Sequence, residues 1–345
     1  MDEIVVRETS QLDKKSGPRI GNVVLNYKGY DFPIHATPIV MESGEVAILT
    51  NIRASGGRSR VVLQDLLGNE IRTLLETGYE HANFTNDDEK IYIFTSNSSN
   101  PQLYTFDRKT FNQISNMPLG KSRIQSVCCD KEYIYTFDMN SGDIQTRNKD
   151  GKLITEIKKG EHDSYMYITS KGVHIAQLGE LGITDEYRKQ LEKRFGKEFM
   201  DLNFVFKSLA YDEKTQTTYV GSRNLVFVAN PKGIKGVMYF KDKDIMGLYM
   251  DPVTQSLMIS SINWPEADEC APSNKGGSLE ILPTDMINER IQKSMEYLEK
   301  RMLLNKKSLL QQREDELSQL NSEAEAITQE ERLMIPQNEE RLTGE

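Results

Sequence analysis

Three of the four histidines in this 345-residue chain occupy comparable places, and imidazole is a side chain that readily does chemistry at neutral pH. His35, His81 and His162 each lie where one group of predicted β-strands connects to the next. Three imidazoles that meet can bind a metal ion. Histidine is also common in polar loops, and the spacing does not require these three to converge. We therefore predict no metal and no cofactor, and keep the three as candidate binding residues.

Two aromatic residues extend this candidate binding face. Trp264, the only tryptophan, lies in a long insertion beside Pro265, and Tyr187 lies in a second insertion with a predicted helix over Thr184–Phe195. Large aromatic side chains on loops are frequent anchors for protein partners. Trp264 could equally fold back over its own β-sheet, so both roles stay open. The predicted binding face thus contains Trp264, His35, His81, His162 and Tyr187, with no catalytic residue assigned.

A repeated phrase of turn, glycine and β-rich run indicates which elements position these residues. Its glycines are Gly21, Gly68, Gly151 and Gly233, and a degenerate copy without glycine occupies 107–114. Successive copies lie about 40 residues apart, with one copy missing between the last two, and this period is typical of a β-propeller with four strands per blade.

The strand pattern predicts an all-β, six-bladed propeller over 19–282. Blades are expected at about 34–77, 80–118, 123–159, 163–206 and 207–241, with the last beginning near Met246. That last blade lacks a fourth strand, and Asn22–Tyr27 is itself a copy of the fourth-strand phrase. We expect this N-terminal strand to complete the last blade, because ring closure removes exposed sheet edges.

The turns Asp150-Gly151-Lys152 and Leu67-Gly68-Asn69 resemble those of six-bladed propellers of the NHL and TolB-like kind. The resemblance covers about 22–282 and implies a fold, since that superfamily includes lactonases, lyases, receptor ectodomains and binding scaffolds. Its lactonase members hold a divalent metal with Glu, Asn and Asp side chains on inner strands. No residues of this chain can be assigned to that ligand set, which argues against an enzyme.

The segment 283–335 predicts one long helix or coiled coil, because no glycine or proline interrupts Met286–Leu333. Apolar positions recur every three or four residues, with a one-residue skip at Leu309/Leu310 that predicts local overwinding or a break. Asn305 and Arg313 are polar positions within this seam. The predicted oligomerisation seam consists of Ile291, Met295, Leu298, Met302, Leu309, Leu310, Leu317, Leu320 and Ile327. Residues 1–18 are predicted to be a flexible arm and 336–345 a disordered tail.

Composition limits the partners and the compartment. The net charge is −9, which is unfavourable for binding nucleic acid. No apolar run is long enough to span a bilayer, the first residues lack a secretory signal pattern, and three cysteines do not suggest a disulfide framework. We expect a cytoplasmic or particle-bound protein that contacts neither membrane nor nucleic acid.

These features favour a non-enzymatic assembly scaffold. The propeller would present a binding face, and the helix would drive homo-oligomerisation or docking into a larger complex, such as a virion or another particle. The alternative is a metal-dependent lactonase or lyase with its metal at the propeller axis.

Overall fold

The computed structural model describes residues 20–28, 31–53, 58–78, 81–96, 101–119, 124–138, 143–157, 164–169, 172–177, 184–197, 206–230, 233–251, 253–263 and 276–334. The predicted arm, the predicted tail and the Trp264 loop lie outside these residues. The chain forms two compact units, 1–295 and 296–345, which are described separately below.

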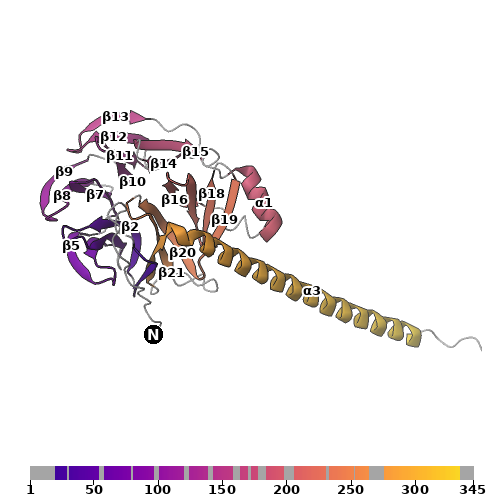
Figure 1. Cartoon of the computed structure of the whole chain (residues 1–345). Coiled ribbons are helices and arrows are strands. Elements are labelled where there is room, and N and C mark those ends of the chain that lie inside the picture. Colours follow the sequence, from indigo (N-terminus) through magenta and orange to yellow (C-terminus); the bar gives the residue numbers. More distant parts are fainter. Residues whose placement is uncertain are drawn as a thin grey trace, which may run out of the picture. The chain divides into compact units, whose positions relative to one another are not determined.

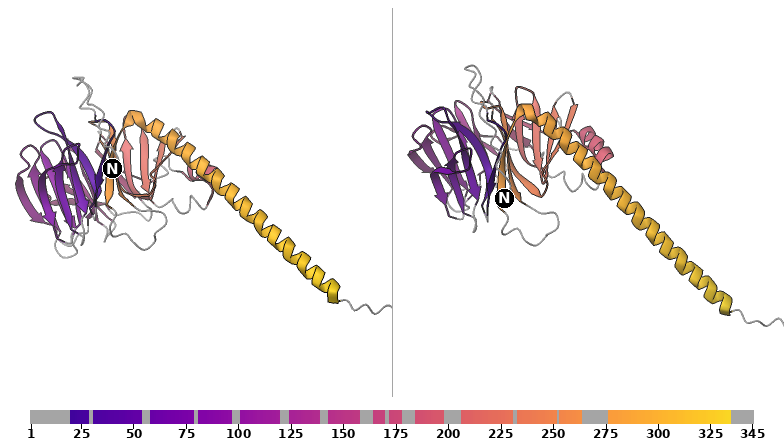
Figure 2. Two further views of the ribbon diagram at one scale, coloured as in Figure 1. Left: turned by 90° about the horizontal axis from the view of Figure 1, so that it is seen from below. Right: turned by 60° about the horizontal axis from the view of Figure 1, so that its bottom comes forward.

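The first unit is a β-propeller built from five four-stranded antiparallel blades around an axis (Figure 1). In Figure 2 the sheets stand face to face beside one another. Four of the blades are continuous in sequence: β2 (Phe32–Val40), β3 (Val46–Arg53), β4 (Ser59–Gln64) and β5 (Glu70–Thr77); β6 (His81–Asn86), β7 (Lys90–Ser96), β8 (Gln102–Asp107) and β9 (Gln113–Pro118); β10 (Ile124–Cys129), β11 (Tyr133–Asp138), β12 (Ile144–Asn148) and β13 (Leu153–Ile157); β16 (Phe206–Asp212), β17 (Thr217–Ser222), β18 (Leu225–Asn230) and β19 (Gly233–Tyr239).

The prediction of six blades is wrong. Where a four-stranded blade was expected over 163–206, the described residues form a two-stranded sheet of β14 (Ser164–Thr169) and β15 (Gly172–Gln177). The next described element is the helix α1 (Asp185–Phe195), and Phe206, expected to end this blade, begins β16 of the following one. The prediction already places a helix over Thr184–Phe195 and needs Glu198–Phe206 for the outer strands, of which 198–205 lie outside the described residues.

The predicted ring closure is confirmed. Strand β1 (Val23–Tyr27) pairs antiparallel with β22 (Gly277–Pro283), from Val23 opposite Ile281 to Tyr27 opposite Gly277. With β20 (Lys243–Asp251) and β21 (Ser256–Asn263) these strands form the closing blade, in the order β1-β22-β21-β20. The outer edge of the last blade is thus supplied by the beginning of the chain.

The core lies between the faces of neighbouring blades, so the inner and middle strands bury both of their faces. In β18, for example, every residue from Leu225 to Ala229 is buried. The outer strand β5 is instead mostly exposed from Glu70 to Thr73. One apolar cluster joins the β2–β5 blade to the β6–β9 blade, and another joins the closing blade to the β2–β5 blade. Burial of this apolar area is the main stabilising contribution.

Two copies of the repeated phrase form the same turn between the third and fourth strands of a blade. Gly68 and Gly151 have φ of 84° and 86°, a left-handed conformation that favours glycine. Asp65 in one turn and Asn148 in the other accept backbone N–H bonds from residues two and four positions later. The repeat therefore has a common backbone cause.

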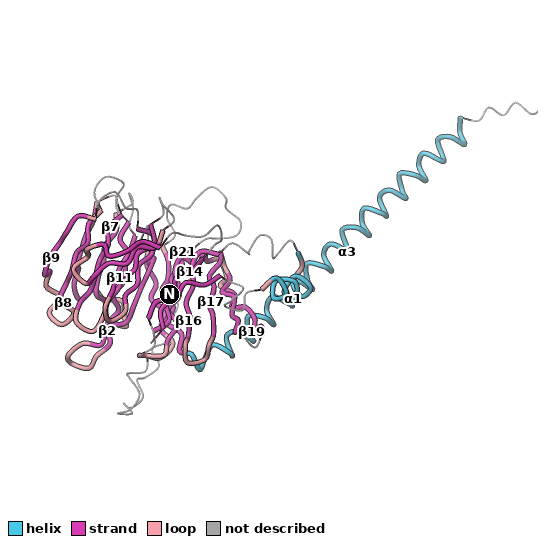
Figure 3. The backbone as a smooth tube through the Cα atoms, turned by 90° about the horizontal axis from the view of Figure 1, so that it is seen from above, coloured by secondary structure: helices cyan, strands magenta, loops and turns pink. Residues whose placement is uncertain are grey.

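Two α-helices, α1 and α3, have both ends among the described residues. Helix α1 begins after Thr184, whose hydroxyl accepts the Tyr187 N–H, and it ends at Gly196. A 3-10 turn, η2 (Thr284–Met286), leads into α3 (Ile287–Met334), which is one uninterrupted helix of 48 residues (Figure 3). The break considered at Leu309/Leu310 is therefore absent. No helix among the residues the structure describes is long and apolar enough to cross a membrane.

Candidate functional site

The structure separates the residues of the predicted binding face. His35 lies in β2 and His81 in β6, both inner strands, while Tyr187 lies in α1. His162 and Trp264 fall outside the described residues, and for His81 only the backbone position is described. The structure thus gives contacts for two of the five residues, His35 and Tyr187.

His35 is packed between aromatic rings of two neighbouring blades. Its ring centroid lies 4.7 Å from that of Phe84 in β6 and 5.7 Å from that of Tyr249 in β20. Burial lowers the pKa of His35 to about 4, so the imidazole is neutral at pH 7. A neutral ring between aromatic neighbours contributes packing near the axis, and no ion pair with an acidic group accounts for its state.

A metal centre is not assembled by the residues whose positions are described. None of them form a group of three or more histidine, cysteine, aspartate or glutamate side chains that could hold an ion. The two free cysteines in this set, Cys128 and Cys129, are buried.

A polar cluster that the sequence analysis did not single out joins two blades. Asp87, in the turn between β6 and β7, lies 2.8 Å from the Lys149 ammonium in the turn between β12 and β13. The Tyr92 hydroxyl donates to the same carboxylate oxygen at 2.9 Å, and Lys149 also donates to the Asp130 carbonyl. Burial raises the pKa of Asp87, but the Lys149 bond, the backbone N–H bonds and the Tyr92 bond outweigh it, so the pKa is lowered.

The chemistry of this cluster is structural. The nearby Cys129 thiol bonds the Asn86 carbonyl, and burial raises its pKa, so it is protonated and not an activated nucleophile. The charges of Asp87 and Lys149 satisfy each other across the blade boundary. The sequence contains a signal for this turn, an aspartate followed five residues later by a tyrosine. The Tyr135 hydroxyl donates to the Asp130 carboxylate just as the Tyr92 hydroxyl donates to Asp87.

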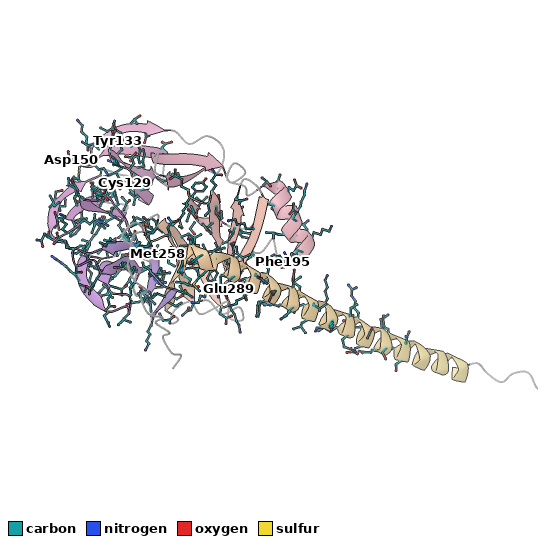
Figure 4. The ribbon with its side chains drawn as sticks, in the orientation of Figure 1. Cys129, Tyr133, Asp150, Phe195, Met258 and Glu289 are labelled. Carbon is teal, nitrogen blue, oxygen red and sulfur yellow. The ribbon has the colours of Figure 1, made fainter. Side chains whose placement is uncertain are left out.

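Helix α1 covers the edge of the β16–β19 blade. The Tyr187 hydroxyl donates to the Gly236 carbonyl in β19 at 2.9 Å, and its ring meets Phe227 edge-on at 6.2 Å. Leu191 and Phe195 follow on the same helix face and are also buried. Figure 4 labels Phe195 on α1. Tyr187, predicted as a binding residue, is therefore buried and holds α1 against the blade.

The first turns of α3 pack against the same strand. A Cβ atom added to Gly236 would lie 2.7 Å from Ile291 Cγ2 and 3.5 Å from Met295 Sδ, so only glycine permits this approach. Arg290 stacks 5.1 Å from the centre of the Phe240 ring and lies 3.7 Å from the Glu280 carboxylate. Glu289, labelled in Figure 4, lies in the same turn. The base of α3 is thus fixed by apolar packing and an ion pair.

This base corrects the predicted oligomerisation seam. Ile291 and Met295 are buried in the first unit, so the first two seam positions pack within the chain rather than against another chain. The sequence periodicity could not reveal this, because both kinds of partner demand the same apolar spacing.

The second unit presents the apolar surface best suited to a partner. Between Glu296 and Met334 the only described element is the rest of α3. Leu303, Leu310 and Leu317 follow at intervals of seven residues and are 56%, 59% and 60% exposed. Leu320 extends the stripe and is 60% exposed. We call Leu303, Leu310, Leu317 and Leu320 the leucine stripe.

The remaining seam residues also lie on α3. Leu298 and Met302 precede the leucine stripe, whereas Leu309 and Ile327 have described backbones but undescribed side chains. Leu304, by contrast, is 66% exposed but follows Leu303 directly and so points about 100° away from the stripe. Exposed leucines therefore occur both on the seam and off it.

Comparisons with known proteins bear on the fold alone. No protein-family model matches the chain, and no curated protein matches it by sequence. Among solved structures, it resembles the glutaminyl cyclase of Myxococcus xanthus, with 11% identity, a TM-score of 0.37, and coverage of 76% of this chain and 99% of that one. A luciferin-regenerating enzyme gives 8% identity and a TM-score of 0.46, with coverage of 76% and 97%.

A third similar structure is the Dos1 propeller, at 8% identity and a TM-score of 0.33. The match covers 72% of this chain and 53% of the Dos1 chain. The predicted resemblance is confirmed by the five blades themselves, at the level of a β-propeller.

Proposed function

We propose that this protein is a non-enzymatic assembly scaffold, in which a propeller platform carries a helix that binds another protein chain. The observation that supports the proposal is the leucine stripe on α3, four exposed leucines on a helix that is the only described element of its unit. Contiguous exposed apolar surface of this kind is typical of protein interaction sites.

The heptad spacing indicates the kind of partner. Leu303, Leu310 and Leu317 repeat every seven residues, which is the period of helices that pack side by side. An amphipathic helix of this kind is expected to pair with another helix, including a second copy of itself. A coiled coil between chains is therefore part of the proposal.

The anchoring of α3 supports a role as a connector. Ile291 and Met295 pack on the propeller, and Arg290 adds an ion pair with Glu280. We assign the propeller this platform role, and the protein no chemical reaction.

Several finer expectations stay predictions. They are membership of the NHL or TolB-like group, a cytoplasmic or particle-bound location, a place in a virion, and a binding role for Trp264 and His162. None of them is needed for the helix proposal.

Paired leucine variants of the full chain test the proposal. Leu310→Asp with Leu317→Asp should weaken association on the order of a hundredfold or more, because each buried leucine contributes about 1.5–3 kcal/mol. Leu304→Asp is the matched control, since it is equally exposed but lies off the stripe, and it should leave association within about threefold. Sedimentation velocity across a concentration series provides the measurement. Equal behaviour of the two variants, with unchanged helical circular dichroism, would refute the stripe as an interface.

A further inference from the structure

The charges of α3 change sign along the second unit. Residues 296–313, the basic half, contain five basic and two acidic residues, a net charge of +3. Residues 314–334, the acidic half, contain one basic and seven acidic residues, a net charge of −6. The change falls between Arg313 and Glu314, within one continuous helix.

This order is not what stabilises a single helix. The helix dipole favours acidic residues at the N-terminal end and basic residues at the C-terminal end, whereas Glu330 and Glu331 lie in the last two turns of α3. Segregated charges also forgo many stabilising pairs of opposite charge three or four residues apart. Two amide-to-carboxylate bonds span one turn of the helix here, from Gln311 to Asp315 at 3.0 Å and from Gln319 to Glu323 at 3.1 Å. The pattern therefore needs another explanation.

We propose that two copies of this chain pair through α3 in antiparallel orientation, with the basic half of each helix against the acidic half of the other. The inference rests on the proposed function, since it names a second copy as the partner. A parallel pair would place like charges side by side along the whole unit, which disfavours that alternative.

The apolar positions fit a midpoint at Asp315. Leu303 and Ile327 lie twelve residues before and after it, and Leu310 and Leu320 lie five residues before and after it. In an antiparallel pair centred there, each residue lies opposite its counterpart, so leucine meets isoleucine or leucine in both layers. Leu303, Leu310 and Leu320 of the stripe would thus be buried against apolar residues, while Leu317 would lie opposite Arg313.

The flanking charges obey the same symmetry. Lys307 and Glu323 lie eight residues before and after Asp315, and Lys300 and Glu330 lie fifteen residues before and after it. Each pair lies at the same height along the two helices but on opposite flanks of the apolar contact. These residues therefore add to the general attraction between the basic half and the acidic half without forming direct ion pairs. A homodimer would contain each match twice.

Cysteine cross-linking of the full chain tests the orientation. In a Cys270→Ser background, Leu303→Cys and Ile327→Cys are prepared separately, oxidised singly and as a mixture, and analysed without reductant. Antiparallel pairing predicts little cross-linked dimer from either variant alone, because the two like positions would lie roughly 36 Å apart. The mixture should give a disulfide-linked dimer.

The possible outcomes separate this inference from the proposed function. Cross-linking of each single variant with itself would overturn the antiparallel orientation and leave helix-mediated association intact. Absence of any cross-link, with the mass of one chain by light scattering, would overturn pairing with a second copy. Retained helical circular dichroism in both variants controls for unfolding.

Charge exchange provides an independent test. A variant with Lys300→Glu and Lys307→Glu, and another with Glu323→Lys and Glu330→Lys, should each self-associate at least about tenfold more weakly than the natural chain. Mixed together, they should form a heterodimer, because each then offers the charge that the other lacks. Self-association of both variants at the natural strength, with no preference for the mixture, would overturn the proposed pairing.

Discussion

Truncating Leu25 in the strand that closes the propeller should destabilise the whole ring. Leu25 lies in β1 opposite Leu279, is only 5% exposed, and packs in the apolar cluster that joins the closing blade to the β2–β5 blade. The substitution Leu25→Ala removes buried methyl groups at the point where the two ends of the propeller sequence meet.

The expected magnitude follows from the burial. Leucine-to-alanine changes at buried sites cost roughly 3–5 kcal/mol, because transfer free energy and a cavity term add. Val24, the residue before Leu25 in the same strand, points to the opposite face and is 37% exposed. Val24→Ala should cost less than about 1 kcal/mol and is the matched control.

Urea denaturation followed by far-ultraviolet circular dichroism measures both variants. If the slope m is about 3 kcal/mol per molar, Leu25→Ala should lower the midpoint by about 1 M or more, and Val24→Ala by about 0.3 M or less. Equal shifts in the two variants would refute the argument that β1 closes the ring through its buried face. A small shift for Leu25→Ala would have the same meaning.

Three further substitutions test other contacts. Gly236→Ala should lower the free energy of unfolding by about 2 kcal/mol and speed proteolysis near the start of α3, because the new Cβ enters the contact with that helix. Gly44→Ala is the control, since Gly44 also has a positive φ but lies in open space; it should cost less stability and leave proteolysis unchanged. His35 has a pKa of about 4 in the folded chain against 6.5 unfolded, so its neutral form contributes stability fully above pH 6.5, and this stability is lost as pH falls towards 4. His35→Asn should remove roughly 2–3 kcal/mol of that pH dependence. An unchanged dependence of unfolding free energy on pH would contradict the burial of the imidazole. Asp87, whose pKa is lowered, stabilises the fold above its unfolded pKa of about 4. The stability that Asp87→Asn loses relative to the natural chain should therefore shrink as pH falls below 4. A constant difference in unfolding free energy between the two chains from about pH 7 to about pH 3 would contradict the ion pair with Lys149.

Much of the propeller could be predicted because its turns have local causes. Gly68 and Gly151 mark the same turn with positive φ, and the copy at Asn22–Tyr27 locates the closing strand. The blade count was less accessible, since the described part of the fourth predicted blade forms two strands, β14 and β15, and Phe206, assigned to its outer strands, pairs in the next blade. A period finds strands, whereas the number of complete blades depends on long-range pairing.

The candidate site was only partly predictable for a similar reason. The apolar period of α3 is visible in the sequence, but it does not distinguish Ile291, which packs on the propeller, from Leu310, which is exposed. Tyr187 likewise has the properties expected of a binding residue, but it is buried on the face of α1 that packs against the β16–β19 blade. The sign change of charge at Arg313/Glu314 could have been found without a structure. The structure adds that this change falls within one continuous helix, α3.

The mass of the native full-length chain in solution tests the central claim most directly. Multi-angle light scattering at micromolar concentration should give twice 39.5 kDa, or 79 kDa, because the leucine stripe is buried between two copies. The same sample carrying Leu310→Asp and Leu317→Asp should give 39.5 kDa. A mass of 39.5 kDa for the natural chain across the accessible concentrations would contradict self-association through α3.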